Sequence, residues 1–219
     1  PYNLSNNLSN NLSNNLSNNL NLINNLDYFR QIGLWSTDLI TPIFENTFKQ
    51  ILESASNCYI VPKYIKQGYD KIYCLNINPG HHARYNKYGG YCYLNNAGIC
   101  AKSLLCDYEL KYNKVAILDL DYHAGDGTSE IFNSDQNVLT ISIHINPKYD
   151  YPFYSGYKFE NTDTNYNFTF EPNCSVNDYL NLVEQSMKKI MNFNPDALII
   201  AFGGDTYKND LDAIETNRT

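Results

Sequence analysis

The sequence predicts an α/β protein of three layers (α/β/α), in which helices cover both faces of a mainly parallel β-sheet. Three observations support this prediction. Short apolar runs recur along the chain, helical patterns separate most of them, and histidine or aspartate residues follow the runs directly. A repeated order of strand, helix and strand places neighbouring strands in parallel.

Four runs have the length and apolar content of buried strands. They span residues 71–77, 114–120, 137–144 and 196–204. Four other segments have apolar residues at helical spacing. They span residues 42–57, 95–105, 127–132 and 176–191. The first helix is expected to begin near Pro42, because proline suits the first turn of a helix.

The first part of the chain differs from the rest in composition. Residues 1–26 repeat the sequence Asn-Asn-Leu-Ser, and both Asn and Ser compete with the helix for backbone hydrogen bonds. We therefore expect a low-complexity segment that is disordered or forms a marginal helix. Residues 27–219 are expected to form one domain, because a chain of 219 residues leaves room for little else.

Composition excludes several classes of function. A net charge of −7 and a pI near 5.0 argue against direct nucleic-acid binding and favour cationic substrates or partners. No run approaches the ~18 apolar residues of a membrane span, so no membrane association is expected. The six cysteines include no C-x-x-C pair and are expected to be reduced. These features predict a cytoplasmic or nuclear protein.

The densest polar motif follows the second predicted strand. Asp119, Asp121 and His123 alternate there, so that strand periodicity directs the three side chains to one side. Buried carboxylates repel one another unless a cation joins them. Asp205 follows the last predicted strand and completes a set of two carboxylates and one imidazole with Asp121 and His123. Such a set suits catalytic Zn²⁺, because it leaves a position open for water and substrate.

A second motif follows the first predicted strand. His81 and His82 come directly after a Pro-Gly turn, which would aim both rings inward. Adjacent imidazoles near a metal are candidates for general acid and base, and each needs a carboxylate partner. Asp119 and Asp126 are available for this.

Each motif also has a simpler interpretation. An isolated D-x-D is usually a solvated loop, an isolated His beside an apolar strand is usually a core residue, and two histidines in a turn can be solvated. The coincidence of the motifs with Asp205 favours the metal site.

Six segments in this order resemble the histone deacetylase and acetylpolyamine amidohydrolase superfamily, which has the arginase/deacetylase fold. They are NPGHHA (78–83), GGYCYLNNAGI (89–99), ILDLDYHAGDGTSEIF (117–132), VLTISIH (138–144), YPFYSGY (151–157) and FGGDTYKND (202–210). The resemblance covers roughly residues 41–210. The YPFYSGY segment looks more like the acetylpolyamine amidohydrolase branch.

The resemblance implies roles for individual positions. Those matching Asp121, His123 and Asp205 bind the catalytic zinc in the family. Those matching His81 and His82 handle protons, and their partners match Asp119 and Asp126. The family's monovalent-cation site, usually K⁺, is built from positions matching Asp119, Asp121, His123 and Ser142, with a second site near Phe132 and Val138.

The activity that the resemblance implies is hydrolysis of an acetamide on a lysine side chain or a polyamine. Tyr91 matches an aromatic residue that lines the substrate channel. His82, backed by Asp126, would be the base, and His81, backed by Asp119, would act mainly through its charge.

The sequence departs from the family in two places. Ala124 stands where the family usually has a second histidine. The family also carries a catalytic tyrosine in a glycine-rich loop well beyond the position of Asp205, and no such loop occurs here. We therefore expect a truncated domain with impaired activity. The alternative is a catalytically silent fragment that binds metal or an acetylated ligand. An arginase-type site with two manganese ions fits poorly, because only one set of transition-metal ligands is visible.

Overall fold

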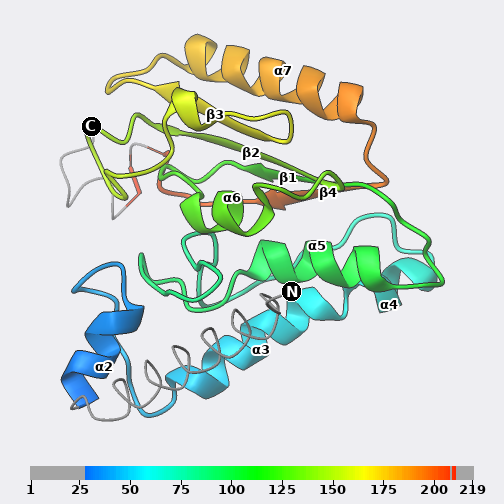
Figure 1. The fold of residues 1–219 in the computed structure, drawn as a ribbon. Helices are drawn as coiled ribbons and strands as arrows, with labels where there is room; N and C mark the ends of the chain where they lie inside the picture. The colour runs from blue at the N-terminus through cyan, green and yellow to red at the C-terminus, as the bar shows by residue number, and fades with distance from the viewer. Residues whose placement is uncertain (1–27, 208, 211–219) are drawn as a thin grey trace, which may run out of the picture.

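The computed structural model of the chain describes residues 28–207 and 209–210. Its centre is a four-stranded parallel sheet with the strand order β3-β2-β1-β4. The strands are β1 (Val115–Asp119), β2 (Val138–Ile145), β3 (Asn165–Phe170) and β4 (Ala197–Ala201). Helix α7 (Val176–Phe193) covers one face, while α5 (Asn96–Cys106) and α3 (Thr47–Tyr59) lie on the other side (Figure 1). The three-layer prediction is confirmed.

Four shorter elements complete the described chain. They are α2 (Tyr28–Trp35), α4 (Val61–Lys66), α6 (Asp126–Phe132) and the 3-10 helix η1 (Lys158–Glu160). Helix α6 follows β1 and lies on the same side of the sheet as α5 (Figure 1). No helix within the described ranges combines the length and the apolar character needed to span a membrane.

Alternating side chains of β1 build both halves of the core. Val115 and Ile117 belong to the cluster on the α5 side, together with Leu104 and Phe132. Ala116 and Leu118 belong to the cluster on the α7 side. Successive residues of a strand point to opposite faces, so one fully buried strand stabilises both layers.

The first predicted strand does not form. Residues 71–77 run without regular strand pairing, and Tyr73 and Leu75 are 82% and 77% exposed. A cavity of about 970 Å³ is lined both by this segment and by β4. The cavity separates this apolar run from the free edge of β4, so the two backbones do not pair.

Two further predictions need correction. Helix α3 begins at Thr47 rather than near Pro42, because Phe44 and Thr47 close a turn in which the Thr47 hydroxyl accepts the Phe44 N–H at 2.7 Å. Strand β3 was not predicted, although Tyr166, Phe168 and Phe170 do alternate with polar residues in it. The low-complexity prediction for residues 1–26 lies outside the described residues.

Candidate metal centre and histidine–aspartate dyads

The topology of the sheet brings the two acidic motifs together. β1 ends at Asp119 and pairs in parallel with β4, in the register Asp119 to Ala201. The segments that follow both strands therefore leave the same edge of the sheet. The backbone N–H of Tyr122 donates a hydrogen bond to Asp205 Oδ1 at 3.1 Å, which joins the two segments directly.

Asp121, His123 and Asp205 form the candidate metal site. Their ligand atoms all lie within 4.8 Å of one another, and the described part of the chain contains no other such group of three. His123 Nδ1 lies 3.2 Å from Asp121 Oδ1 and 3.1 Å from Asp205 Oδ2. Tetrahedral zinc with bonds of about 2.0–2.1 Å separates its ligands by about 3.3 Å. The donor types and their spacing thus fit one zinc ion.

The backbone near these ligands is adapted to their close approach. A side chain on Gly203 would clash with Asp121 Oδ2, so glycine lets the β4 segment lie against this carboxylate. The N–H of His123 donates to Asp121 Oδ1 at 2.8 Å. Burial alone would raise the pKa of Asp121, but the nearby His81 and His123 outweigh burial and lower that pKa.

His81 and Asp119 form the first dyad. His81 Nδ1 lies 2.8 Å from Asp119 Oδ2, and His81 Nε2 lies 3.6 Å from Asp121 Oδ1. Burial opposes protonation of His81, but Asp121 and Asp119 together raise its pKa to about 10. His81 therefore carries positive charge beside a candidate metal ligand.

His82 and Asp126 form the second dyad, with His82 Nδ1 2.7 Å from Asp126 Oδ1. Burial and the neighbouring charge of His81 lower the pKa of His82, despite the attraction of Asp126. The two adjacent histidines thus have opposite pKa shifts. Because a carboxylate only accepts hydrogen bonds, Asp126 places the proton of neutral His82 on Nδ1 and leaves Nε2 free.

Ser142 and His144 do not join the histidine pair. Ser142 Oγ accepts the N–H of Gly125 at 3.2 Å and lies 2.7 Å from His144 Nδ1. His144 Nε2 lies 2.9 Å from the carbonyl oxygen of Gly156. His144 is fully buried near the carboxyl end of β2. A small cavity of about 10 Å³ is bordered by Asp119, Gly125 and Ser142.

The predicted channel residue lies next to the second dyad. Gly90 packs so closely on the His82 ring that a side chain there would clash with it, and its φ of +55° also favours glycine. Tyr91 follows directly, is 52% exposed, and donates its N–H to Thr41 Oγ1 at 3.0 Å. This position suits a residue at the entrance to the site.

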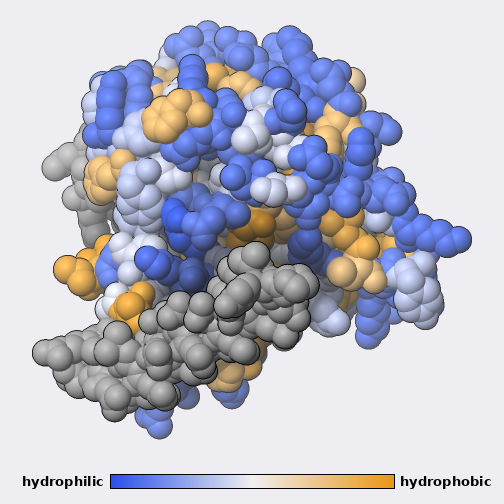
Figure 2. Space-filling model, in the orientation of Figure 1, coloured by the Kyte–Doolittle hydropathy of each residue, from blue (hydrophilic) through white to orange (hydrophobic). Residues whose placement is uncertain are grey.

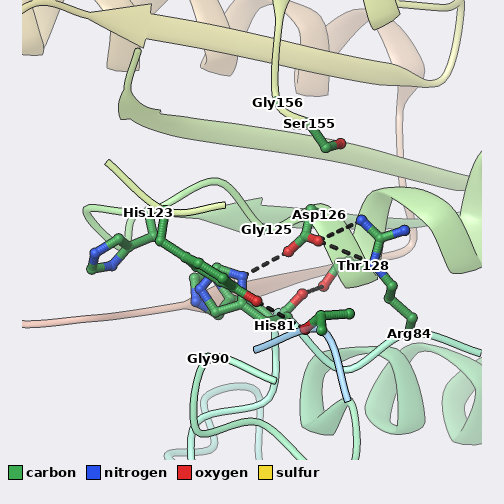
Figure 3. A network of polar contacts seen from close by, with 12 residues as sticks. His81, Arg84, Gly90, His123, Gly125, Asp126, Thr128, Ser155 and Gly156 are labelled. Atoms are coloured by element: carbon green, nitrogen blue, oxygen red, sulfur yellow. Dashed lines mark hydrogen bonds and ion pairs between the residues drawn. The ribbon is translucent and has the colours of Figure 1, made fainter. Parts of the chain in front are cut away.

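Three residues of the site were missed in the sequence. The Tyr151 ring packs edge-on against His82 at 4.7 Å, the Tyr154 hydroxyl donates to Asp126 Oδ2 at 3.2 Å, and Arg84 donates to the same oxygen. Figure 3 shows the Asp126 carboxylate between Arg84 and the histidines. Both tyrosines lie in the quoted YPFYSGY segment, but nothing in its pattern indicates which residues they contact.

Fold and site together define an α/β protein in which two histidine–aspartate dyads adjoin a three-residue set of candidate metal ligands. The family model described as histone deacetylase domain matches residues 6–217. The chain therefore belongs to the histone deacetylase family.

Individual relatives agree with this assignment. Acetylpolyamine amidohydrolase 1 of Pseudomonas aeruginosa is 35% identical over 82% of this chain and 53% of its own length. The crystal structure of acetylpolyamine aminohydrolase from Burkholderia pseudomallei has a TM-score of 0.73 at 34% identity, over 78% of this chain and 50% of that one. A histone deacetylase homologue from Aquifex aeolicus, at 23% identity, has a TM-score of 0.69 over 84% of this chain and 53% of that one, and supports the fold. The chain spans about half the length of these relatives.

Proposed function

We propose that this chain carries the zinc-binding and proton-transfer part of a deacetylase that hydrolyses acetamides of acetylated polyamines or lysine side chains. One observation carries the proposal: both histidine–aspartate dyads adjoin the cluster of Asp121, His123 and Asp205. The names of the relatives favour polyamines, and the net charge of −7 suits a cationic substrate.

Each group has a task in this reaction. When bound by Asp121, His123 and Asp205, zinc supplies a Lewis acid for the acetyl carbonyl and lowers the pKa of water. His82 takes the proton from the attacking water at Nε2, because Nδ1 is committed to Asp126. His81 stays protonated and stabilises negative charge. Tyr91 guides the extended acetylated amine at the entrance.

We also propose a monovalent cation, K⁺, near Asp119 and Ser142. The small cavity between them is close to the size of one water molecule, and the Asp119 carboxyl group that borders it is buried. A cation there would offset part of the charge of the acidic residues without occupying the zinc site. Flame photometry after equilibration in K⁺ and in a large organic cation would test this.

Metal analysis and an activity assay on the same sample test the main proposal. We expect one zinc per chain and weak hydrolysis of acetylputrescine or an acetyl-lysine peptide that is lost in His82→Ala. Zinc binding without any hydrolysis dependent on His82 would support the alternative, a silent fragment that binds metal. Absence of zinc binding would contradict both.

A further inference from the structure

Arg84 turns back from the histidine pair onto helix α6. Its Nε and Nη2 donate to Asp126 Oδ2 at 3.1 and 2.6 Å, and its Nη1 donates to Glu130. Asp126 and Glu130 are four residues apart and lie on the same side of α6. The guanidinium group also lies 5.1 Å from the centre of the Tyr154 ring. Arg84 therefore joins the histidine segment to α6 and to the loop that carries Tyr154.

These contacts occupy one oxygen of the Asp126 carboxylate. Figure 3 shows the Arg84 guanidinium group bonded to the Asp126 carboxylate. Oδ2 accepts from Arg84 and from the Tyr154 hydroxyl, whereas Oδ1 faces His82 Nδ1 at 2.7 Å. Rotation of the carboxylate would break three hydrogen bonds at once. Asp126 is buried, so water cannot readily replace them. The orientation of Oδ1 toward His82 thus depends on what holds Oδ2.

The first dyad is held in a different way. Asp119 Oδ2 faces His81, and Asp119 Oδ1 accepts the backbone N–H of Asp121 at 3.1 Å. A backbone donor belongs to the fold, and truncating a side chain does not remove it. Arg84 is a side chain and can be replaced. The second dyad is therefore the one whose geometry rests on a particular residue type.

We propose that Arg84 is a positioning residue for His82: by fixing Asp126 Oδ2 it keeps Oδ1 on His82 Nδ1, and so keeps Nε2 unprotonated. This inference rests on the proposed role of His82 as the base. Arginine is required rather than lysine, because its planar fork reaches both Asp126 and Glu130, whereas an ammonium group is a single point of charge.

The test measures the tautomer of His82 directly. Zinc-free chain labelled with ¹⁵N-histidine would be studied by NMR near pH 8, with the four histidines assigned by single His→Gln variants. We expect His82 to have a protonated Nδ1 and a bare Nε2 in the wild type. Arg84→Gln should populate the opposite tautomer, Arg84→Lys should restore the wild-type form only in part, and Tyr154→Phe should have the smallest effect.

Controls separate this role from general stability. Lys102→Gln removes a different ion pair, to Asp135, and should leave the His82 signals unchanged. Asp126→Asn should give the largest change. An Arg84→Gln chain that remains folded by circular dichroism with the wild-type His82 tautomer would overturn the inference, and Arg84→Lys provides the same test if the glutamine variant unfolds. Because the zinc-free protein is used, failure of the proposed activity would not affect this result.

Where hydrolysis is measurable, a second readout is available. Arg84→Gln should lower kcat by about 10- to 100-fold, the usual effect of removing a group that orients a site histidine. KM should change little, because Arg84 contacts Asp126 and not the entrance. A change in KM alone would contradict the positioning role.

Discussion

The two neighbours of β1 in the sheet differ in burial although both are apolar in sequence. β2 is buried at all eight positions, whereas Leu198 and Ile200 of β4 are 40% and 55% exposed. β2 lies between β1 and β3 and is covered by α7, while β4 pairs only with β1. An apolar run therefore predicts a strand that is suited to burial. Whether the strand is buried depends on the strands and helices that pack beside it.

This difference extends to the candidate site. The four dyad residues are buried, whereas the three candidate metal ligands are each partly exposed, and Asp205 follows the half-exposed strand β4. The cavity between β4 and residues 71–77 reaches His81 and Asp121. Figure 2 shows patches of hydrophobic residues, in orange, among the hydrophilic residues of this face of the molecule. An exposed apolar edge of a parallel sheet is unusual, because helices normally cover both faces of such sheets.

The largest expected effect concerns the metal. Asp121→Ala should abolish zinc binding, because two remaining ligands cannot hold a catalytic zinc ion. Zinc content after dialysis and metal analysis checks this. The surface variant Asp135→Ala is the matched control and should retain zinc. If Asp121→Ala bound as much zinc per chain as the wild type, the metal ligands would have to be other residues.

The rate of hydrolysis tests whether the exposed β4 side of the site limits catalytic activity. The 219 residues contain no glycine-rich loop with the family's catalytic tyrosine, whose hydroxyl would stabilise the oxyanion. We expect the isolated chain to hydrolyse acetylputrescine about 10²- to 10³-fold more slowly than Pseudomonas aeruginosa acetylpolyamine amidohydrolase 1, the usual cost when one oxyanion donor is missing. Tyr207 is the tyrosine nearest to Asp205 in the sequence and the first candidate for a substitute donor; its side chain is 62% exposed and its hydroxyl accepts a hydrogen bond from Asn209. Equal rates, lost in Tyr207→Phe, would assign the role to Tyr207 after all.

Stability should differ between the two sides of the sheet. Ile117→Ala in β1 should lower the free energy of unfolding by about 2–5 kcal/mol, because this side chain is 1% exposed and leaves a cavity. Ile200→Ala removes the same atoms from a side chain that is 55% exposed and should cost about 1 kcal/mol or less. Urea unfolding of both variants measures the difference. Equal losses would mean that the β4 side is covered in solution.

The smallest effect is expected in acid. Burial would raise the pKa of Asp126, but His82 and Arg84 outweigh it and lower that pKa in the folded state. The stability from this group is therefore complete above the unfolded pKa of about 3.9 and is lost as the pH falls through the lower folded pKa. Arg84→Gln should raise the folded pKa and shift acid unfolding to higher pH. Circular dichroism between pH 6 and 2 checks this, with Lys188→Gln, an exposed pair with Glu184, as the control.

The sequence by itself indicated the three-layer fold and most of the site. Strand periodicity and the parallel order were enough to place Asp119, Asp121 and His123 at one edge of the sheet. The same argument brought Asp205 to that edge, since the carboxyl ends of parallel strands coincide. These inferences needed only local pattern and strand direction.

Tertiary structure decided the rest. It left residues 71–77 without a paired strand, buried His144 in the core, and brought Arg84 to Asp126 across 42 positions of sequence. Hydrophobic periodicity describes one element at a time, whereas pairing, burial and side-chain hydrogen bonds depend on which elements become neighbours. Contacts between distant segments therefore emerge only when the chain is folded.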